Sequence, residues 1–270
     1  GSPRERGRQY GEQAKARILR GIDHYSAQLE GNKLGWPSIQ AIVAQFEPRI
    51  AAFEASYLEE MKGIAEGAGV EAAAVVLLNA RTEILKMAIR RQRGLPAMLD
   101  ATIDPDGCTG LAVMPQAAAA GRVIHAQNWD WKAECAETAV VLRIRRDDGP
   151  DILTFTEAGG LARSGLNAAG IAITANYLES DRDYRQVGVP LALIRRKVLE
   201  QLHVALAMQA VHATAKSASN NMIVSASDTA GRGVAIDFEC APDETFQVLP
   251  EHGVLVHANH FISPVAQAKL

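Results

Sequence analysis

The chain has 270 residues, of which 48% are hydrophobic and 22% are charged, and its formal net charge is −3. This composition is typical of a soluble globular protein with one large domain or two small ones. The weak negative charge gives no electrostatic basis for nucleic-acid binding, and no apolar run approaches the roughly 20 residues that cross a bilayer. We therefore expect neither nucleic acid nor a membrane as a partner.

The first hundred residues are predicted to be helical, because apolar or small residues recur at helical spacing with charges on the other face. The helical segments fall at residues 8–25, 39–47, 55–66 and 71–89. Ser38 is predicted to cap the second of these helices and Pro48 to end it. Residues 94–96 (GLP) then mark a loop that leads to Gly107 and Cys108.

After Cys108 the hydrophobic period changes from 3.6 to 2, which is typical of strands. Strands are predicted at residues 109–114, 122–127, 138–145, 152–156, 171–175, 222–227, 234–239, 246–249 and 254–257. One or two amphipathic helices are expected over residues 190–215, with Pro190 in the first turn, and another helix begins within residues 263–267. Antiparallel strands with grouped helices predict an α+β layered fold.

The cysteines Cys108, Cys135 and Cys240 are widely spaced and odd in number. This pattern argues against a disulfide framework and fits a reducing compartment, so we expect a cytoplasmic protein. Neither Cys-x-x-Cys nor His-x-x-x-His spacing occurs in the sequence. We therefore expect no metal ion and no other cofactor.

Short motifs in the second part of the chain carry most of the functional information. They are DGCT at 106–109, QNWDW at 127–131, TEAG at 156–159, GLNAAGIAI at 165–173 and HANH at 257–260. With these motifs in this order, the chain from about residue 10 to residue 261 resembles the acyl-coenzyme A:6-aminopenicillanic acid acyltransferase family. These proteins are also called the C45 peptidases and belong to the N-terminal nucleophile hydrolases.

The resemblance implies a four-layer αββα sandwich and a precursor that cuts itself between Gly107 and Cys108. Residues 1–107 would become a mainly helical α chain. Residues 108–270 would become a β-rich catalytic β chain in the same domain, with more of it expected after Leu270. The implied partners are the two chains of this heterodimer and a small-molecule amide or acyl-donor substrate, and the sequence leaves a higher oligomer open.

The chemistry of an N-terminal cysteine explains why cleavage would come first. A thiol at its ordinary pKa is mostly protonated at neutral pH and needs a base. The freed α-amine of Cys108, with a pKa of about 8, would accept the proton, whereas the same nitrogen is an amide before cleavage. Gly107 suits the scissile position because it has no Cβ, which leaves the thiol room to attack its carbonyl.

The resemblance also implies roles for residues downstream of Cys108. Asp130 would orient its α-amino group, while the side-chain amide of Asn259 and the backbone N–H of Asn176 would stabilise the oxyanion. The structural alternatives are an ion pair or cap for Asp130 and a turn for the two asparagines. Candidates for the substrate pocket are Asn128, Trp129, Trp131 and Tyr177, with core packing as the alternative for the tryptophans.

Residues 79–83 (NARTE) resemble a further family motif. Within this motif, Arg81 and Glu83 are predicted to be structural ion-pair members near the site.

The leading hypothesis is a self-processing amidohydrolase or acyltransferase that acts on a small N-acyl amine through a thioester on Cys108. Nothing in the sequence decides between hydrolysis and acyl transfer. A conventional cysteine hydrolase is the second reading, in which Cys108 pairs with His125, His257 or His260 without chain cleavage. An inactive scaffold with a binding role is the third.

Overall fold

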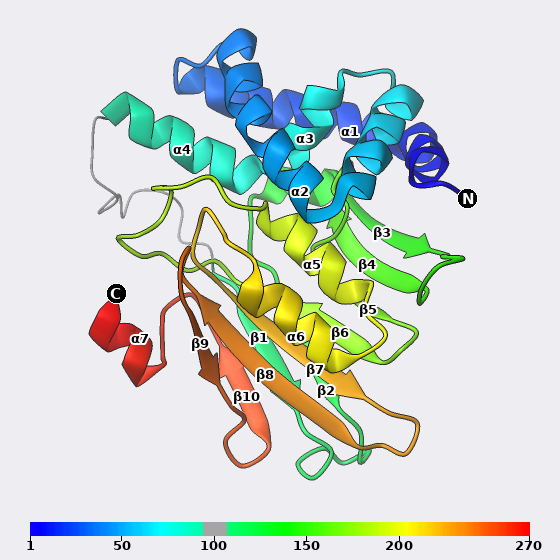
Figure 1. The fold of residues 1–270 in the computed structure, drawn as a ribbon, viewed down its shortest axis with the longest axis vertical. Coiled ribbons are helices and arrows are strands. Elements are labelled where there is room, and N and C mark those ends of the chain that lie inside the picture. The colour runs from blue at the N-terminus through cyan, green and yellow to red at the C-terminus, as the bar shows by residue number, and fades with distance from the viewer. Residues whose placement is uncertain (94–106) are drawn as a thin grey trace.

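The N-terminal third of the chain is helical in the computed structural model of the protein, which describes residues 1–93 and 107–270. Its helices are α1 (Pro3–Gly31), α2 (Trp36–Ala68), α3 (Ala72–Asn79) and α4 (Arg81–Arg93). They gather at one end of the molecule (Figure 1). The predicted loop at 94–96 lies outside the described residues.

Helices α1 and α2 approach each other closely, because both carry glycines four residues apart at their contact. Gly7 and Gly11 on α1 meet Gly63 and Gly67 on α2. A Cβ at Gly7 or Gly63 would overlap a backbone carbonyl oxygen of the opposite helix. Only glycine therefore permits this spacing between the two backbones.

Helix α2 runs through Pro48, so the prediction that this proline ends a helix is wrong. The helix has its kink at Glu54 instead, where φ of −162° and ψ of 97° are extended. Phe46 and Ile50 flank the proline and are fully buried in the core. Burial of these side chains offsets the single backbone hydrogen bond that a proline removes from a helix.

Two other helix boundaries also differ from the sequence pattern. Helix α2 begins at Trp36 with Gly35 as its N-cap, so Ser38 lies inside the first turn and does not cap it. The single helix predicted over residues 71–89 is divided into α3 and α4 at Ala80, where φ is −116° and ψ is 19°.

Two antiparallel sheets follow Gly107. The small sheet has the strand order β10-β1-β2 and the large sheet the order β3-β4-β5-β6-β7-β8-β9. Their strands are β1 (Thr109–Val113), β2 (Ile124–Asn128), β3 (Ala139–Ile144), β4 (Ile152–Glu157), β5 (Ser164–Asn167), β6 (Ile171–Thr174), β7 (Asn220–Ser227), β8 (Gly233–Cys240), β9 (Thr245–Val248) and β10 (Val254–His257). The α+β prediction is confirmed, although the sequence pattern did not predict β5.

The large sheet is covered on both faces. Helices α5 (Leu191–Leu199) and α6 (Val204–Ala213) lie over one face (Figure 1). The small sheet packs on the other face. An apolar cluster joins the two sheets and comprises Ala112, Met114, Ile223, Ala235 and Leu255. The order is thus helix, large sheet, small sheet, and a short helix α7 (Pro264–Lys269) follows the last strand.

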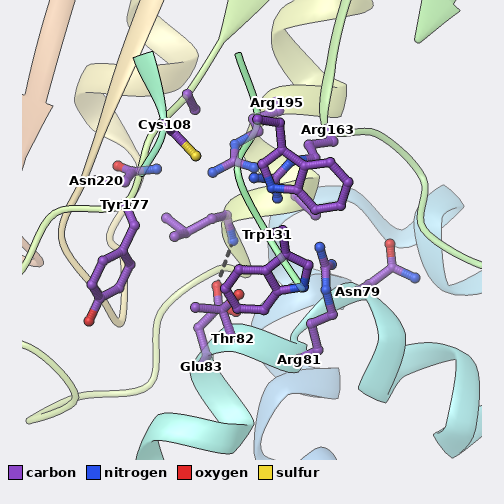
Figure 2. Close-up of a pocket in the computed structure, with 14 residues that line it drawn as sticks. Asn79, Arg81, Thr82, Glu83, Cys108, Trp131, Arg163, Tyr177, Arg195 and Asn220 are labelled. Atoms are coloured by element: carbon purple, nitrogen blue, oxygen red, sulfur yellow. Dashed lines mark hydrogen bonds between the residues drawn. The ribbon is translucent and has the colours of Figure 1, made fainter. Parts of the chain in front are cut away.

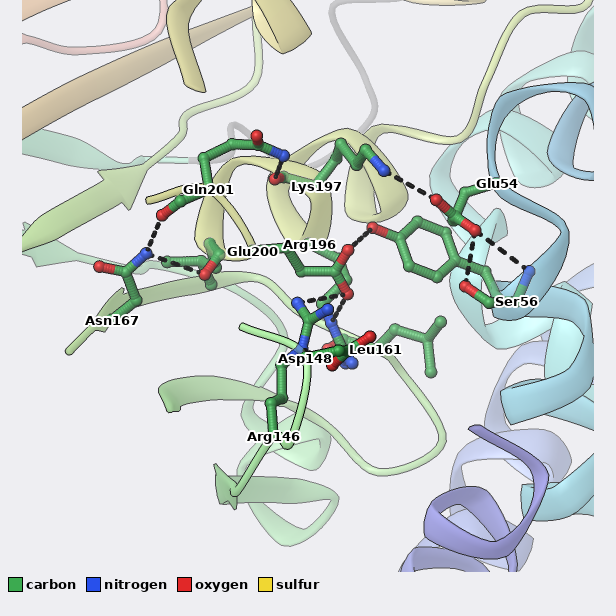
Figure 3. A network of polar contacts seen from close by, with 12 residues as sticks. Glu54, Ser56, Arg146, Asp148, Leu161, Asn167, Arg196, Lys197, Glu200 and Gln201 are labelled. Carbon is green, nitrogen blue, oxygen red and sulfur yellow. Dashed lines mark hydrogen bonds and ion pairs between the residues drawn. The ribbon is translucent and has the colours of Figure 1, made fainter. Parts of the chain in front are cut away.

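A buried polar network ties α5 to α2 (Figure 3). The guanidinium of Arg196 donates to both carboxylate oxygens of Glu60, at 3.2 and 3.1 Å, and to Glu200 at 2.8 Å. Nearby, the ammonium of Lys197 donates to Glu54 at 2.7 Å. These contacts join residues that precede Gly107 to residues that follow it.

None of the helices among the described residues combines the length and the apolar character needed to cross a membrane. All three cysteines lie within the described ranges, and no disulfide joins them.

Candidate active site

The small sheet brings three of the predicted site residues together. Strand β1 starts directly after Cys108 and pairs with β2 on one side and β10 on the other. Strand β2 ends at Asn128 and β10 at His257. Because both are antiparallel to β1, their C-terminal ends lie beside its N-terminal end. Asp130 and Asn259, each two residues beyond a strand end, therefore flank Cys108.

Cys108 is held on both sides by these neighbours. Its side chain is buried, and the thiol donates to the backbone carbonyl of Asp130 with an S–O distance of 3.8 Å. Its backbone N–H donates to Oδ1 of Asn259 at 2.7 Å. The amide nitrogen of Asn259 in turn donates to the backbone carbonyl of Tyr177 at 2.9 Å. The backbone and side chain of Cys108 are thus fixed by the two predicted partners.

The carboxylate of Asp130 lies against Gly107, on the N-terminal side of the nucleophile. A Cβ at Gly107 would sit 2.9 Å from Oδ2 of Asp130, closer than real Cβ atoms approach an oxygen. Asp130 itself is solvent-exposed, so it needs no buried counter-ion. The contact places a negative charge next to the Gly107–Cys108 peptide bond.

Asn176 lies behind the site and is almost completely buried. Its backbone N–H, which the resemblance assigns to the oxyanion, donates here to Oδ1 of Asn221 at 2.6 Å. Its side-chain amide donates to the backbone carbonyls of His257 and Ala258, at 2.8 and 3.2 Å. In this geometry Asn176 anchors the segment that carries Asn259.

A pocket opens in front of Cys108 (Figure 2). It is lined by Asn79, Arg81, Thr82, Glu83, Cys108, Trp129, Trp131, Arg163, Ala175, Tyr177, Leu191, Ala192, Arg195 and Asn220. Three of the four candidates for a substrate pocket line this cavity, namely Trp129, Trp131 and Tyr177. The fourth candidate, Asn128, does not line the pocket and is exposed at the end of β2.

Arg81 and Glu83 both line the pocket, but their contacts differ. Arg81 forms a buried ion pair with Glu157 and donates to the hydroxyl of Tyr25 at 2.9 Å, which confirms the predicted ion pair. Glu83 forms no such pair among the described residues. Its carboxylate accepts from the backbone N–H of Leu191 at 2.8 Å, and burial raises its pKa.

Two arginines of the pocket, Arg163 and Arg195, were not singled out from the sequence. Arg163 lies between β4 and β5, with its guanidinium carbon 4.2 Å from the centre of the Trp129 ring. Arg195 lies on α5 and is 7% exposed. Burial, together with repulsion from Arg81, lowers the pKa of Arg163 to about 10. Burial and repulsion from Arg163 lower the pKa of Arg195 to about 9.

Both arginines do carry a signal in the sequence. Arg163 stands between the motifs at 156–159 and 165–173, and Arg195 follows the apolar run LALI at 191–194. An arginine between functional motifs or directly after an apolar run is a candidate for a substrate-binding site, because charged groups are rarely buried without a partner.

The three histidines of the alternative reading lie away from this pocket. Both ring nitrogens of His125 bond hydroxyl groups, at 2.7 and 2.8 Å, and burial lowers its pKa to about 4. His257 is buried and bonds Glu239 at 2.7 Å, while His260 is exposed. None of them lines the pocket beside Cys108. The geometry gives no support to a Cys–His pair.

Comparison with known proteins agrees with the motifs. Residues 118–269 match the family described as acyl-coenzyme A:6-aminopenicillanic acid acyl-transferase. The 40 kDa form of acyl-coenzyme A:6-aminopenicillanic-acid-acyltransferase from Emericella nidulans is 28% identical over 263 residues, which cover 96% of this chain and 67% of that protein. Since the family match extends over more than half of the sequence, the chain belongs to the acyl-coenzyme A:6-aminopenicillanic acid acyltransferase family.

Proposed function

We propose that the chain is a cysteine amidohydrolase or acyltransferase that acts on the C–N amide bond of a small N-acyl amine after cutting itself between Gly107 and Cys108. One observation carries the proposal: Cys108 directly precedes the central strand of the small sheet and lines a pocket, with Asp130 and Asn259 on its two sides. Membership of an acyltransferase family supports the reaction class.

The proposed cleavage is an N-to-S acyl shift followed by hydrolysis. Sγ of Cys108 attacks the carbonyl carbon of Gly107, and the C–N bond breaks as the nitrogen takes up the thiol proton. Water then hydrolyses the thioester, which leaves a carboxylate on Gly107 and a free α-amine and thiol on Cys108. The absence of a Cβ at Gly107 and the nearby carboxylate of Asp130 support this step. Residues 1–107 and 108–270 would then form the α and β chains.

In the mature enzyme, the α-amine of Cys108 would accept the thiol proton. The thiolate attacks the substrate carbonyl, and the leaving amine takes the proton from the α-ammonium as the C–N bond breaks. Water or a second amine then adds to the thioester and releases an acid or a new amide. In this proposal the carboxylate of Asp130, which lies against Gly107, holds the ammonium group between these steps.

Amide side chains are suited to stabilise the oxyanion in this mechanism. The amide nitrogen of Asn259 carries two hydrogens, and one of them binds the carbonyl of Tyr177. Asn220, which lines the pocket, offers a second amide, since it is fully buried and its amide atoms have no hydrogen-bond partner among the described residues. Donors of this kind contribute roughly 3–4 kcal/mol each in acyl-transfer enzymes.

The proposal includes the four-layer αββα sandwich. Its first three layers correspond to α5 and α6, the large sheet and the small sheet. The outer face of the small sheet exposes Ile124, Val254 and Val256. A fourth, helical layer covers apolar sheet faces of this kind in layered folds.

The intact mass of the purified protein, measured under denaturing and reducing conditions, tests the proposal. We expect two fragments, the second beginning at Cys108, and a single chain for Cys108→Ala. The control His260→Ala should be cut like the parent and remain active. An uncut parent that hydrolyses amides, and loses this activity in His260→Ala, would establish the Cys–His reading instead.

A further inference from the structure

The pocket beside Cys108 holds more positive charge than its own carboxylates can balance. Arg81, Arg163 and Arg195 all line it, but only Arg81 has a carboxylate within ion-pairing distance among the described residues, that of Glu157. The Nε atoms of Arg163 and Arg195 are buried and have no hydrogen-bond partner in the described part of the chain. A buried cation without a partner is costly, so a bound anion would relieve this cost.

The tryptophans of the pocket also have buried hydrogen-bond donors without a partner among the described residues. The indole nitrogens of Trp129 and Trp131 are buried, and neither has a hydrogen-bond partner within residues 1–93 and 107–270. An indole N–H and a guanidinium only donate hydrogen bonds, whereas an ionised carboxylate only accepts them. These indole and guanidinium donors of the pocket therefore complement a carboxylate and not a cationic or purely apolar group.

The residues that the structure describes offer little to neutralise the two arginines. The carboxylate of Glu83 accepts from the N–H of Leu191, and its burial favours the protonated form. A thiolate on Cys108 would balance at most one of the two charges. That charge also disappears when the sulfur becomes acylated.

The position of the arginines indicates which part of a substrate carries the anion. Figure 2 shows the guanidinium of Arg195 turned towards Cys108, with Arg163 beside it. The acyl group stays attached to Sγ of Cys108 while the leaving amine is exchanged for water or another acceptor, so the pocket beside Cys108 must hold the acyl group. The whole pocket is small, with a volume of about 50 Å³, so a short acyl group suits it better than a long one.

From this geometry we propose that Arg163 and Arg195 form an anion subsite for a carboxylate at the far end of the substrate's acyl group. The inference rests on the proposed function and names its substrate class: amides of short dicarboxylic acids, such as N-succinyl or N-glutaryl amines. Arg195 and Arg163 bind the carboxylate, and Cys108 attacks the other, amide carbonyl.

A binding measurement tests the subsite without relying on turnover. Succinate and succinamide share one carbon skeleton and differ in charge, and their binding to the purified protein is followed by tryptophan fluorescence. We expect succinate to bind at least about tenfold more tightly, which corresponds to about 1.4 kcal/mol. Arg163→Gln and Arg195→Gln should each remove most of this preference. Equal affinities of the parent for the two compounds would overturn the inference.

Controls separate charge recognition from folding. Arg185→Gln removes an exposed arginine outside the pocket and should leave the preference for succinate unchanged. Arg195→Lys keeps the charge and should retain part of the preference. Loss of the preference in Arg185→Gln, or its full retention in Arg163→Gln and Arg195→Gln, contradicts the proposal.

Turnover distinguishes this inference from the proposed function. The N-succinyl amide of a fluorogenic amine is compared with its methyl ester, which lacks the charge. We expect the parent to cleave the acid at least about tenfold faster at low substrate concentration. If the N-succinyl amide and its methyl ester are cleaved at equal rates, the subsite is overturned, but the proposed amidase activity stands. Charge-dependent binding without cleavage of either amide contradicts the proposed function but supports the subsite.

Discussion

Replacement of Arg196 by methionine is expected to lower the free energy of unfolding by about 3–5 kcal/mol. Arg196 is fully buried, and its guanidinium contacts Glu60 and Glu200. Methionine has a similar length but no charge, so among the described residues Glu60 would keep only the guanidinium of Arg6, at 2.8 Å, as an ionic partner. Glu60 is 3% exposed, and a carboxylate at such a position is solvated poorly when its partner is lost.

The same substitution changes the response to acid. Burial alone would raise the pKa of Glu60, but Arg196 and Arg6 hold it below the ordinary value of 4.5. Because the folded-state pKa is depressed, the ionised carboxylate stabilises the fold above pH 4.5, and this contribution is lost as the pH falls through the folded-state pKa. In Arg196→Met the pKa of Glu60 rises, so less stability is lost when Glu60 is protonated, and the difference in stability between parent and variant should narrow as the pH falls.

Urea titration at pH 7 and one fixed protein concentration measures the effect. The exposed Arg185→Met is the control and should change the free energy by less than about 0.5 kcal/mol. The double variant Arg196→Met/Glu60→Leu removes both charges and should recover much of the loss, since replacing a whole buried pair is often neutral. A loss below about 1 kcal/mol in Arg196→Met would refute this reasoning about the network.

The remaining predictions address the nucleophile, its neighbours and the packing. Cys108→Ser should still cut itself slowly, whereas amide turnover should fall steeply; parent-like turnover would exclude Cys108 as the nucleophile. Asp130→Asn should slow processing or turnover, measured by mass and by amide hydrolysis, with a near-parental melting temperature because Asp130 is exposed. If it matures and turns over at the parental rate, Asp130 has no part in the site. Gly7→Ala should destabilise the protein by roughly 1–3 kcal/mol in urea titration, because its methyl group must push α1 from α2; an unchanged midpoint would show that the helices separate freely. The pKa of His125 is lowered by burial from 6.5 to about 4, so the folded state resists protonation and stability should fall by about 3 kcal/mol between pH 6.5 and 4. His125→Gln should flatten this dependence, and an equally steep curve in the variant would contradict the assignment.

Local patterns predicted most of the fold, and they failed where tertiary packing outweighs local preference. The change of period after Cys108 located most of the strands, because successive side chains of a strand point to opposite faces of the sheet. Pro48 was predicted to end a helix from backbone geometry alone, but α2 continues because Phe46 and Ile50 are buried on either side. The short strand β5 has few residues over which an alternating pattern could show.

The residues of the candidate site that belong to short sequence motifs could be predicted from the sequence. Cys108, Asp130 and Asn259 belong to the motifs that carry the family resemblance, and they lie just outside the ends of paired strands. Arg163 and Arg195 come from a turn and a helix that meet only in the folded chain. Whether such an arginine has a carboxylate partner depends on three-dimensional contacts that a single sequence does not display.

The contacts between α2 and α5 span the proposed cleavage point. Glu54 and Glu60 precede Gly107, whereas their partners Lys197 and Arg196 follow it. In an intact chain, these groups meet within one molecule, and refolding is a first-order reaction. After cleavage, the same groups belong to two polypeptides, so refolding becomes second-order and the unfolding midpoint rises with protein concentration. A cut that leaves every contact in place would thus make the recovery of the protein from denaturant depend on dilution.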